Sequence, residues 1–147
     1  MSLNLKPSDR AAVAGVIDPD AYTAGDNSTD WISAADFHNF LAMVLVGDIA
    51  SSGTVDAKIE EATDGSGSGA QDLDGKAITQ LTQAGSDSNK QALINLRPED
   101  LSEGFTHFRL TITGATAAAD HGGVVLGFDP LYGKASDADL ASVDQIV

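Results

Sequence analysis

The sequence contains no cysteine and little positive charge. Its 147 residues include no Cys, 8 Lys plus Arg, and 3 His. Without cysteine, disulfides, thiolate catalysis and cysteine-ligated metal centres are excluded. Two cores of half this length would each need cross-links or metals, so we expect one domain held together by its apolar core.

Acidic residues dominate the charge. The 22 acids give a net charge of −14, which repels phosphate, so we expect neither nucleic acid nor an anionic membrane as a partner. Of these acids 18 are Asp and 4 are Glu, beside 15 Gly. Because Asp favours turns and caps, this excess indicates many turns. Adaptation of the host proteome to salt explains it equally well.

Long apolar runs are also missing. The longest, residues 40–46, is much shorter than the ~20 residues that cross a bilayer, so no membrane span is expected. Residues 1–10 lack the apolar segment of a signal peptide. We therefore expect an intact N-terminus and synthesis in the host cytoplasm.

Alternating polarity indicates strands at residues 55–60 and 105–113. Residues 40–46 and 124–128 are continuous apolar runs, typical of strands covered on both sides. Weaker candidate strands are residues 13–17, 76–81 and 91–96. Breakers between strands predict turns that include residues 25–28, 64–69, 72–75 and 120–123. Together these features predict an all-β fold, an antiparallel β-sandwich of jelly-roll-like type, with short helical turns at residues 33–39 and 98–102.

The two ends of the chain lie outside the alternating pattern. We expect an N-terminal arm at residues 1–12, a β-sandwich domain at residues 13–133 and a C-terminal tail at residues 134–147. Ends of this kind fray in a lone domain, or become ordered on a neighbouring subunit in an assembly.

Catalytic and metal-binding patterns are weak. His38, His107 and His121 are too far apart in sequence for a local zinc pair, and a surface position is expected for His107 and a turn for His121. Residues 64–69 are rich in Gly but lack the Lys-Ser/Thr pair of a phosphate loop. In that stretch Gly67 occupies the position where a serine nucleophile would stand.

Asp72 and Asp74 resemble the start of a calcium loop, but Leu81 stands where the closing Glu is required. We therefore expect a turn there. The sequence predicts no catalytic residue, no cofactor and no metal site, and hence a protein that is not an enzyme.

The aromatic residues leave alternatives open. Trp31 is predicted to lie in the core with Phe37 and Phe40. A carbohydrate-binding β-sandwich acting in adhesion is the alternative function, and it requires Trp31, Tyr22 or Tyr132 to be exposed on one face. A third hypothesis is a glycosidase with two Asp carboxyls either about 5 Å or about 7 to 9 Å apart in a cleft, which the short loops disfavour.

Several segments together carry a resemblance to a known class of protein. They are residues 21–26, 30–32, 37–47 and 58–66, followed by residues 104–113 and 123–127. In this order they resemble small structural proteins of tailed bacteriophages, over roughly residues 18–132. The acidic segment after Gly133 departs from that pattern.

The resemblance implies a non-enzymatic virion protein on the capsid exterior, either a head decoration or a head-spike base of the kind also found in gene transfer agents. It further implies rings of three or five copies, docked on a major capsid protein or a spike fibre. Edge strands, loops and termini would make the contacts. The side chains we expect at these contacts are Lys6 and Arg10 near the start, and Leu140, Ile146 and Val147 at the end.

Overall fold

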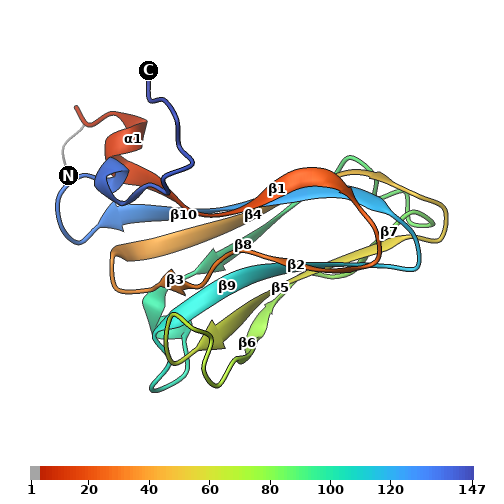
Figure 1. The fold of residues 1–147 in the computed structure, drawn as a ribbon, viewed down its shortest axis with the longest axis horizontal. Coiled ribbons are helices and arrows are strands. Elements are labelled where there is room, and N and C mark those ends of the chain that lie inside the picture. The colour runs from red at the N-terminus through yellow and green to blue at the C-terminus, as the bar shows by residue number, and fades with distance from the viewer. Residues whose placement is uncertain (1–3) are drawn as a thin grey trace.

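The computed structural model describes residues 4–147 and shows two antiparallel sheets packed face to face (Figure 1). Sheet A has the order β1-β10-β4-β8, with bounds Ala11–Tyr22, Ala119–Pro130, Phe37–Ile49 and Gln91–Leu96. Sheet B has the order β2-β9-β5-β6, with bounds Gly25–Ser28, His107–Ala115, Thr54–Ala62 and Gln71–Ala77. Two short strands complete sheet B: β3 (Ile32–Ser33) pairs with β9, and β7 (Leu81–Thr82) pairs with β5.

The chain crosses repeatedly from one sheet to the other. It passes from β1 in sheet A to β2 in sheet B, returns from β3 to β4, and crosses again from β4 to β5. It then crosses three more times, from β7 to β8, from β8 to β9 and from β9 to β10. Such crossings are typical of jelly rolls, so the predicted all-β, jelly-roll-like sandwich is confirmed.

The core lies between the inward faces of the two sheets. From β9, Phe108, Leu110 and Ile112 are each 0% exposed, as the alternating pattern predicts. The Phe108 ring meets Phe40 of β4 edge to face, with centroids 4.7 Å apart. Gly127 of β10 lies under Phe37, where an added Cβ would approach the ring to 2.5 Å, so this contact requires glycine.

Within residues 4–147, helical structure is limited to α1 (Pro7–Arg10) and two 3₁₀ turns, η1 (Pro98–Asp100) and η2 (Ala135–Ala138). The helical turn predicted at residues 98–102 is present, with Pro98 at its first position. The one predicted at residues 33–39 is wrong: a turn spans residues 34–36 and β4 begins at Phe37.

Three predicted turns are strands. Residues 25–28 form β2, residues 72–75 lie in β6, and residues 120–123 lie inside β10. The weak strand at residues 76–81 is also misplaced, since β6 ends at Ala77 and β7 begins at Leu81. β2 and β6 lie at the edges of sheet B and are mostly exposed, so they carry Asp and Gly and lack the apolar alternation that marks half-buried strands.

The terminal segments pack together beside β1. Residues 1–3 of the predicted N-terminal arm lie outside the described residues, and β1 already begins at Ala11. The Val13 N–H donates to Asp139 Oδ1 at 2.7 Å, and the Leu140 N–H donates to the Val13 carbonyl at 3.0 Å. Ala135 is fully buried. The tail up to Leu140 therefore does not fray, because it supplies partners for the backbone of an edge strand.

Candidate functional site

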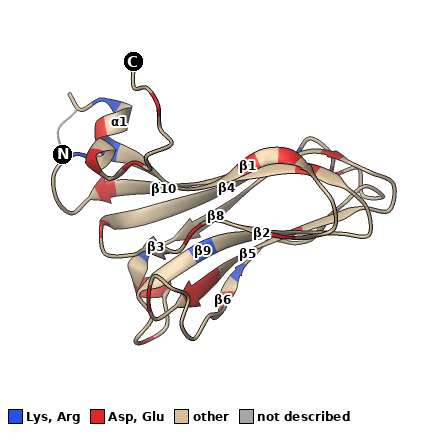
Figure 2. Ribbon diagram, in the orientation of Figure 1, with Lys and Arg blue, Asp and Glu red and all other residues tan. Residues whose placement is uncertain are grey.

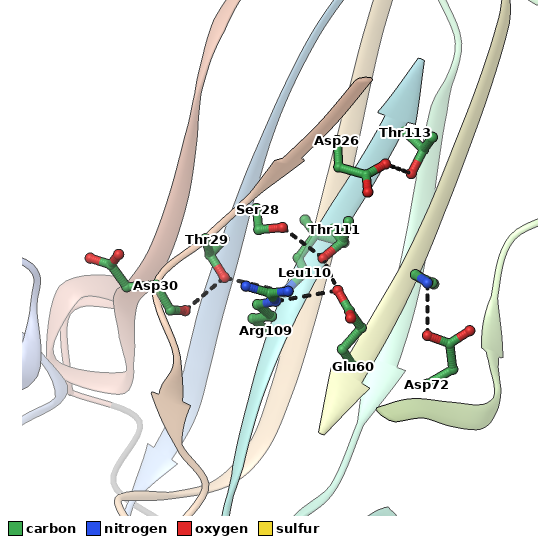
Figure 3. Close-up of polar contacts among 11 residues, drawn as sticks. Asp26, Ser28, Thr29, Asp30, Glu60, Asp72, Arg109, Leu110, Thr111 and Thr113 are labelled. Atoms are coloured by element: carbon green, nitrogen blue, oxygen red, sulfur yellow. Dashed lines mark hydrogen bonds and ion pairs between the residues drawn. The ribbon is translucent and has the colours of Figure 1, made fainter. Parts of the chain in front are cut away.

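The outward face of sheet B is polar and internally hydrogen-bonded (Figure 3). Glu60 of β5 accepts hydrogen bonds from Arg109 Nε at 3.2 Å and from the Thr111 hydroxyl, which also contacts Ser28 Oγ at 2.8 Å. Beside this group, Lys58 Nζ lies 2.7 Å from Asp72 Oδ1, and that hydrogen bond raises the pKa of Lys58. These side chains satisfy one another, so this face has few polar groups left for a ligand.

Trp31 lies at this face and not in the core. Its ring is partly exposed, and the guanidinium carbon of Arg109 lies 4.5 Å from the ring centroid. Gly67 approaches from the loop after β5, where an added Cβ would be 2.6 Å from Trp31 Nε1. The predicted core position of Trp31 is therefore wrong, because Arg109 and the loop cover the ring outside the sandwich.

The other aromatics of the carbohydrate hypothesis lie elsewhere. Tyr22 stacks on the buried His121 with ring centroids 4.5 Å apart. Tyr132 is 88% exposed and follows β10. Trp31, Tyr22 and Tyr132 thus form no shared aromatic platform.

The histidines show no metal-site arrangement. His121 is buried within β10 instead of in the predicted turn, and burial lowers its pKa. His107 lies on β9 with its Nδ1 2.8 Å from Thr106 Oγ1, while His38 is exposed. Within residues 4–147, no group of three or more His, Asp or Glu side chains is placed to hold a metal ion. Over the same residues, no helix is long and apolar enough to cross a membrane.

Glu61 is a buried carboxyl with a structural role that the sequence does not indicate. Its side chain is fully buried at the end of β5. Burial alone would raise its pKa, but the Ser102 N–H at 2.8 Å and Gln71 Nε2 at 2.7 Å donate to its two oxygens and hold the pKa below its usual value. The carboxylate thus ties the loop before β9 to sheet B.

The outward face of sheet A differs in chemistry from that of sheet B. Across the strands, Val16 pairs with Val124, Val124 with Met43, and Met43 with Leu93. We define the apolar face as the outward side chains of this sheet: Val13 and Val16 of β1, Val124, Leu126 and Phe128 of β10, Leu41, Met43 and Leu45 of β4, and Leu93 of β8.

The apolar face is open to solvent and carries no charge. Leu93 is 57% exposed and Leu45 is 46% exposed. The polar side chains beside its central rows, Asn39, Gln91 and Asn95, are uncharged, while Asp20 and Asp120 lie at one end of the face and Arg97 at the other. Figure 2 shows β4 and β10 uncoloured along their central parts, with acidic colour towards strand ends. Residues 40–46 and 124–128 are thus strands as predicted, but they are covered on one side only.

A hollow of about 510 Å³ lies at one end of the apolar face. Leu45, Gly47 and Gly122 line it together with Pro19 and Asp120. The hollow forms where β1 shifts register against β10 between Ile17 and Asp20, beside two glycines that have no side chain to fill it.

Both free edges of sheet A are partly covered. On the β1 edge, the Val13 N–H and carbonyl form hydrogen bonds with Asp139 Oδ1 and the Leu140 N–H. On the β8 edge, Lys76 Nζ donates to the Asn95 carbonyl at 2.8 Å. Because edge strands readily pair with other chains, these contacts leave the apolar face as the more available surface of sheet A.

The predicted assembly residues gather at the opposite end of sheet A from the hollow (Figure 1). Lys6 is exposed before α1, and Arg10 lies 3.9 Å from Asp129. Leu140 is half-buried beside Val13, while Ile146 and Val147 are exposed in a tail that leads away from the sandwich. The structure thus brings the two terminal groups together, but none of these five residues belongs to the apolar face.

This fold is similar to that of a chain in a virus structure, while sequence alone shows no relative. No protein-family model matches the chain, and no curated protein sequence matches it. A chain in the cryo-EM structure of broad bean stain virus matches with a TM-score of 0.50 and 11% identity, covering 88% of this chain and 90% of that one. The chain therefore shares the jelly-roll fold of that viral chain.

Two further viral structures match with lower scores. The VP2 subviral particle of infectious bursal disease virus has a TM-score of 0.47 and 16% identity, with 92% of this chain and 38% of that one covered. The desmodium yellow mottle tymovirus structure has a TM-score of 0.44 and 10% identity, with 90% and 94% covered. At these identities the likeness concerns the fold alone.

Proposed function

We propose that this viral jelly-roll chain is a non-enzymatic structural subunit of a virion that associates with copies of itself. The observation that carries the proposal is the apolar face: an uncharged, exposed sheet surface on a chain of net charge −14. Contiguous exposed apolar surface of this kind marks sites of protein association. Jelly rolls are a common architecture of capsid subunits, which supports the same conclusion.

The more specific form of the proposal is a protein on the capsid exterior, as a head decoration or a head-spike base, in rings of three or five copies. The sequence resemblance to tailed-phage structural proteins supports this form. The terminal group with Lys6, Arg10, Leu140, Ile146 and Val147 would then contact a major capsid protein or a spike fibre. Lys6 and Arg10 supply positive charge, which is scarce in this chain and suits an acidic capsid surface.

The mass of the purified protein in solution tests self-association, measured by light scattering over a range of concentrations. We expect a defined oligomer, and a ring of three or five for the more specific form. A monomer at every concentration would refute self-association. Binding to glycans by that monomer would favour the carbohydrate-binding hypothesis, to which the covered ring of Trp31 is unsuited.

A further inference from the structure

We propose that the apolar face packs against the apolar face of a second copy of this chain. This inference rests on the proposed self-association and identifies the surface that makes it. In a face-to-face pair the same patch contributes from both copies, so the contact is two-fold. If subunits also form a ring through other surfaces, this two-fold contact would join two rings. If they do not, it gives a dimer.

The distribution of charge favours the apolar face over the outward face of sheet B for contact between two copies. Two chains of net charge −14 repel each other, and a contact through the outward face of sheet B would desolvate Asp26 and the ion pairs Glu60–Arg109 and Asp72–Lys58 of both copies. The residues that define the apolar face carry no charge, and Asp20 and Asp120 lie only at its end, so two copies can bury the centre of the face without desolvating a charged side chain. The acidic tail, with Asp137, Asp139 and Asp144, is a poorer occupant for the same reason.

The size of the face suits a small contact. It extends over about five residues of 3.3 Å along four strands spaced by about 4.8 Å, which is a flat area of roughly 300 Å². That area is below the ~800 Å² that each partner contributes to a standard interface, as in weaker, reversible contacts. Packed sheets lie about 10 Å apart with interdigitated side chains, and the Val and Leu rows of this face allow such packing.

The shape of the apolar face indicates how the two copies are oriented in the pair. Phe128 lies half-buried at one end of β10, and the hollow beside Gly122 lies at the other end. A two-fold axis across the strands exchanges these ends and brings Phe128 of one copy over the hollow of the other. It also brings Arg10, which lies next to Phe128, towards Asp20 and Asp120 at the hollow. In this orientation β8 of one copy lies over β8 of its partner.

The first test is the variant Leu93→Glu, analysed by light scattering beside the unchanged protein. Leu93 is 57% exposed, so the fold tolerates the change, while a pair would bury two new carboxylates. We expect the mass of the oligomer to halve and the dissociation constant to rise more than about 100-fold. Ser66→Glu is the matched control: it adds the same charge at an exposed loop position of sheet B and leaves the mass unchanged.

The second test is cross-linking through single cysteines, which are unique labels because the chain has none. With a short thiol–thiol reagent, Leu93→Cys is expected to give a cross-linked dimer and Ser66→Cys none. An oligomer that keeps its mass with Leu93→Glu and does not cross-link at position 93 overturns this inference and leaves self-association standing. A monomeric unchanged protein overturns both.

Discussion

Arg109 and Trp31 form a cation–π pair at the outward face of sheet B, with the guanidinium carbon 4.5 Å from the ring centroid. Arg109 is at the same time bound to Glu60 at 3.2 Å. The arginine therefore holds the only tryptophan against the sheet and connects it to the polar network.

We predict that Arg109→Ala uncovers Trp31. Without the guanidinium the ring has a free face, so acrylamide should quench its fluorescence more strongly. Loss of the cation–π contact should also lower the free energy of unfolding by about 1 kcal/mol. Arg109→Lys is the control for charge, since it keeps the positive charge but lacks the planar group that stacks on the ring. Unchanged quenching in Arg109→Ala would show that Gly67 and its loop alone shield the ring.

The buried Glu61 predicts a sensitivity to acid. Its pKa is lowered in the folded chain, so its contribution to stability is complete above its ordinary pKa of 4.5 and is lost as pH falls through the lower, folded value. Glu61→Gln replaces one of two accepting oxygens by a donor, which leaves the Ser102 N–H or the Gln71 amide unpaired.

For Glu61→Gln we expect the free energy of unfolding at neutral pH to fall by about 1–3 kcal/mol, measured in urea. The loss should shrink as pH drops below 4.5, because the unfolded parent chain takes up a proton there first and the carboxylate's contribution to stability declines towards the lower, folded pKa. A loss that is constant with pH would contradict the role assigned to the charge.

His121 predicts a second pH effect, in a higher range. Burial holds its pKa below 6.5, so the unfolded chain takes up a proton first as pH falls. Stability should therefore decline below about pH 6.5, by at most about 1.4 kcal/mol per pH unit from this group. Measuring unfolding free energy from pH 8 to pH 5 checks this. In His121→Phe, which keeps a ring to stack on Tyr22, the decline between pH 6.5 and 5 should flatten.

The link between Asp139 and Val13 predicts the behaviour of the tail. Asp139→Ala removes the acceptor for the Val13 N–H and should lower the unfolding free energy by about 1 kcal/mol. Limited proteolysis should then cut the tail near residue 139 faster than in the parent protein. Asp144→Ala is the control: Asp144 accepts a hydrogen bond from the adjacent Gln145, so its loss should leave the cutting rate near residue 139 unchanged.

The sequence predicted the architecture because alternation is a direct consequence of burial on one face. In β5 and β9 every second side chain is buried, and both strands were placed within two residues of their observed ends. The edge strands β2 and β6 escaped prediction, since exposed strands need no apolar alternation and their Asp and Gly resemble turns.

The surfaces were harder to predict than the strands. The continuous apolar runs at residues 40–46 and 124–128 were interpreted as strands buried on both sides, because a sequence does not show whether a second layer exists. The outward side chains of these two runs, together with Leu93 on β8 next to β4, form most of the apolar face. The prediction for Trp31 was wrong for a related reason. The sequence around an aromatic residue does not distinguish a ring in the core from one that is covered outside the sheet by a side chain such as Arg109.

The covered edges of sheet A have a further consequence for a protein that would be made in many copies. Open strand edges let identical chains add end upon end into fibres, which compete with an ordered particle. Here the Asp139 carboxylate and the Lys76 ammonium occupy backbone groups on opposite edges of the sheet. At Val13 and Asn95 the fold therefore hinders the addition of a further strand to either edge of sheet A.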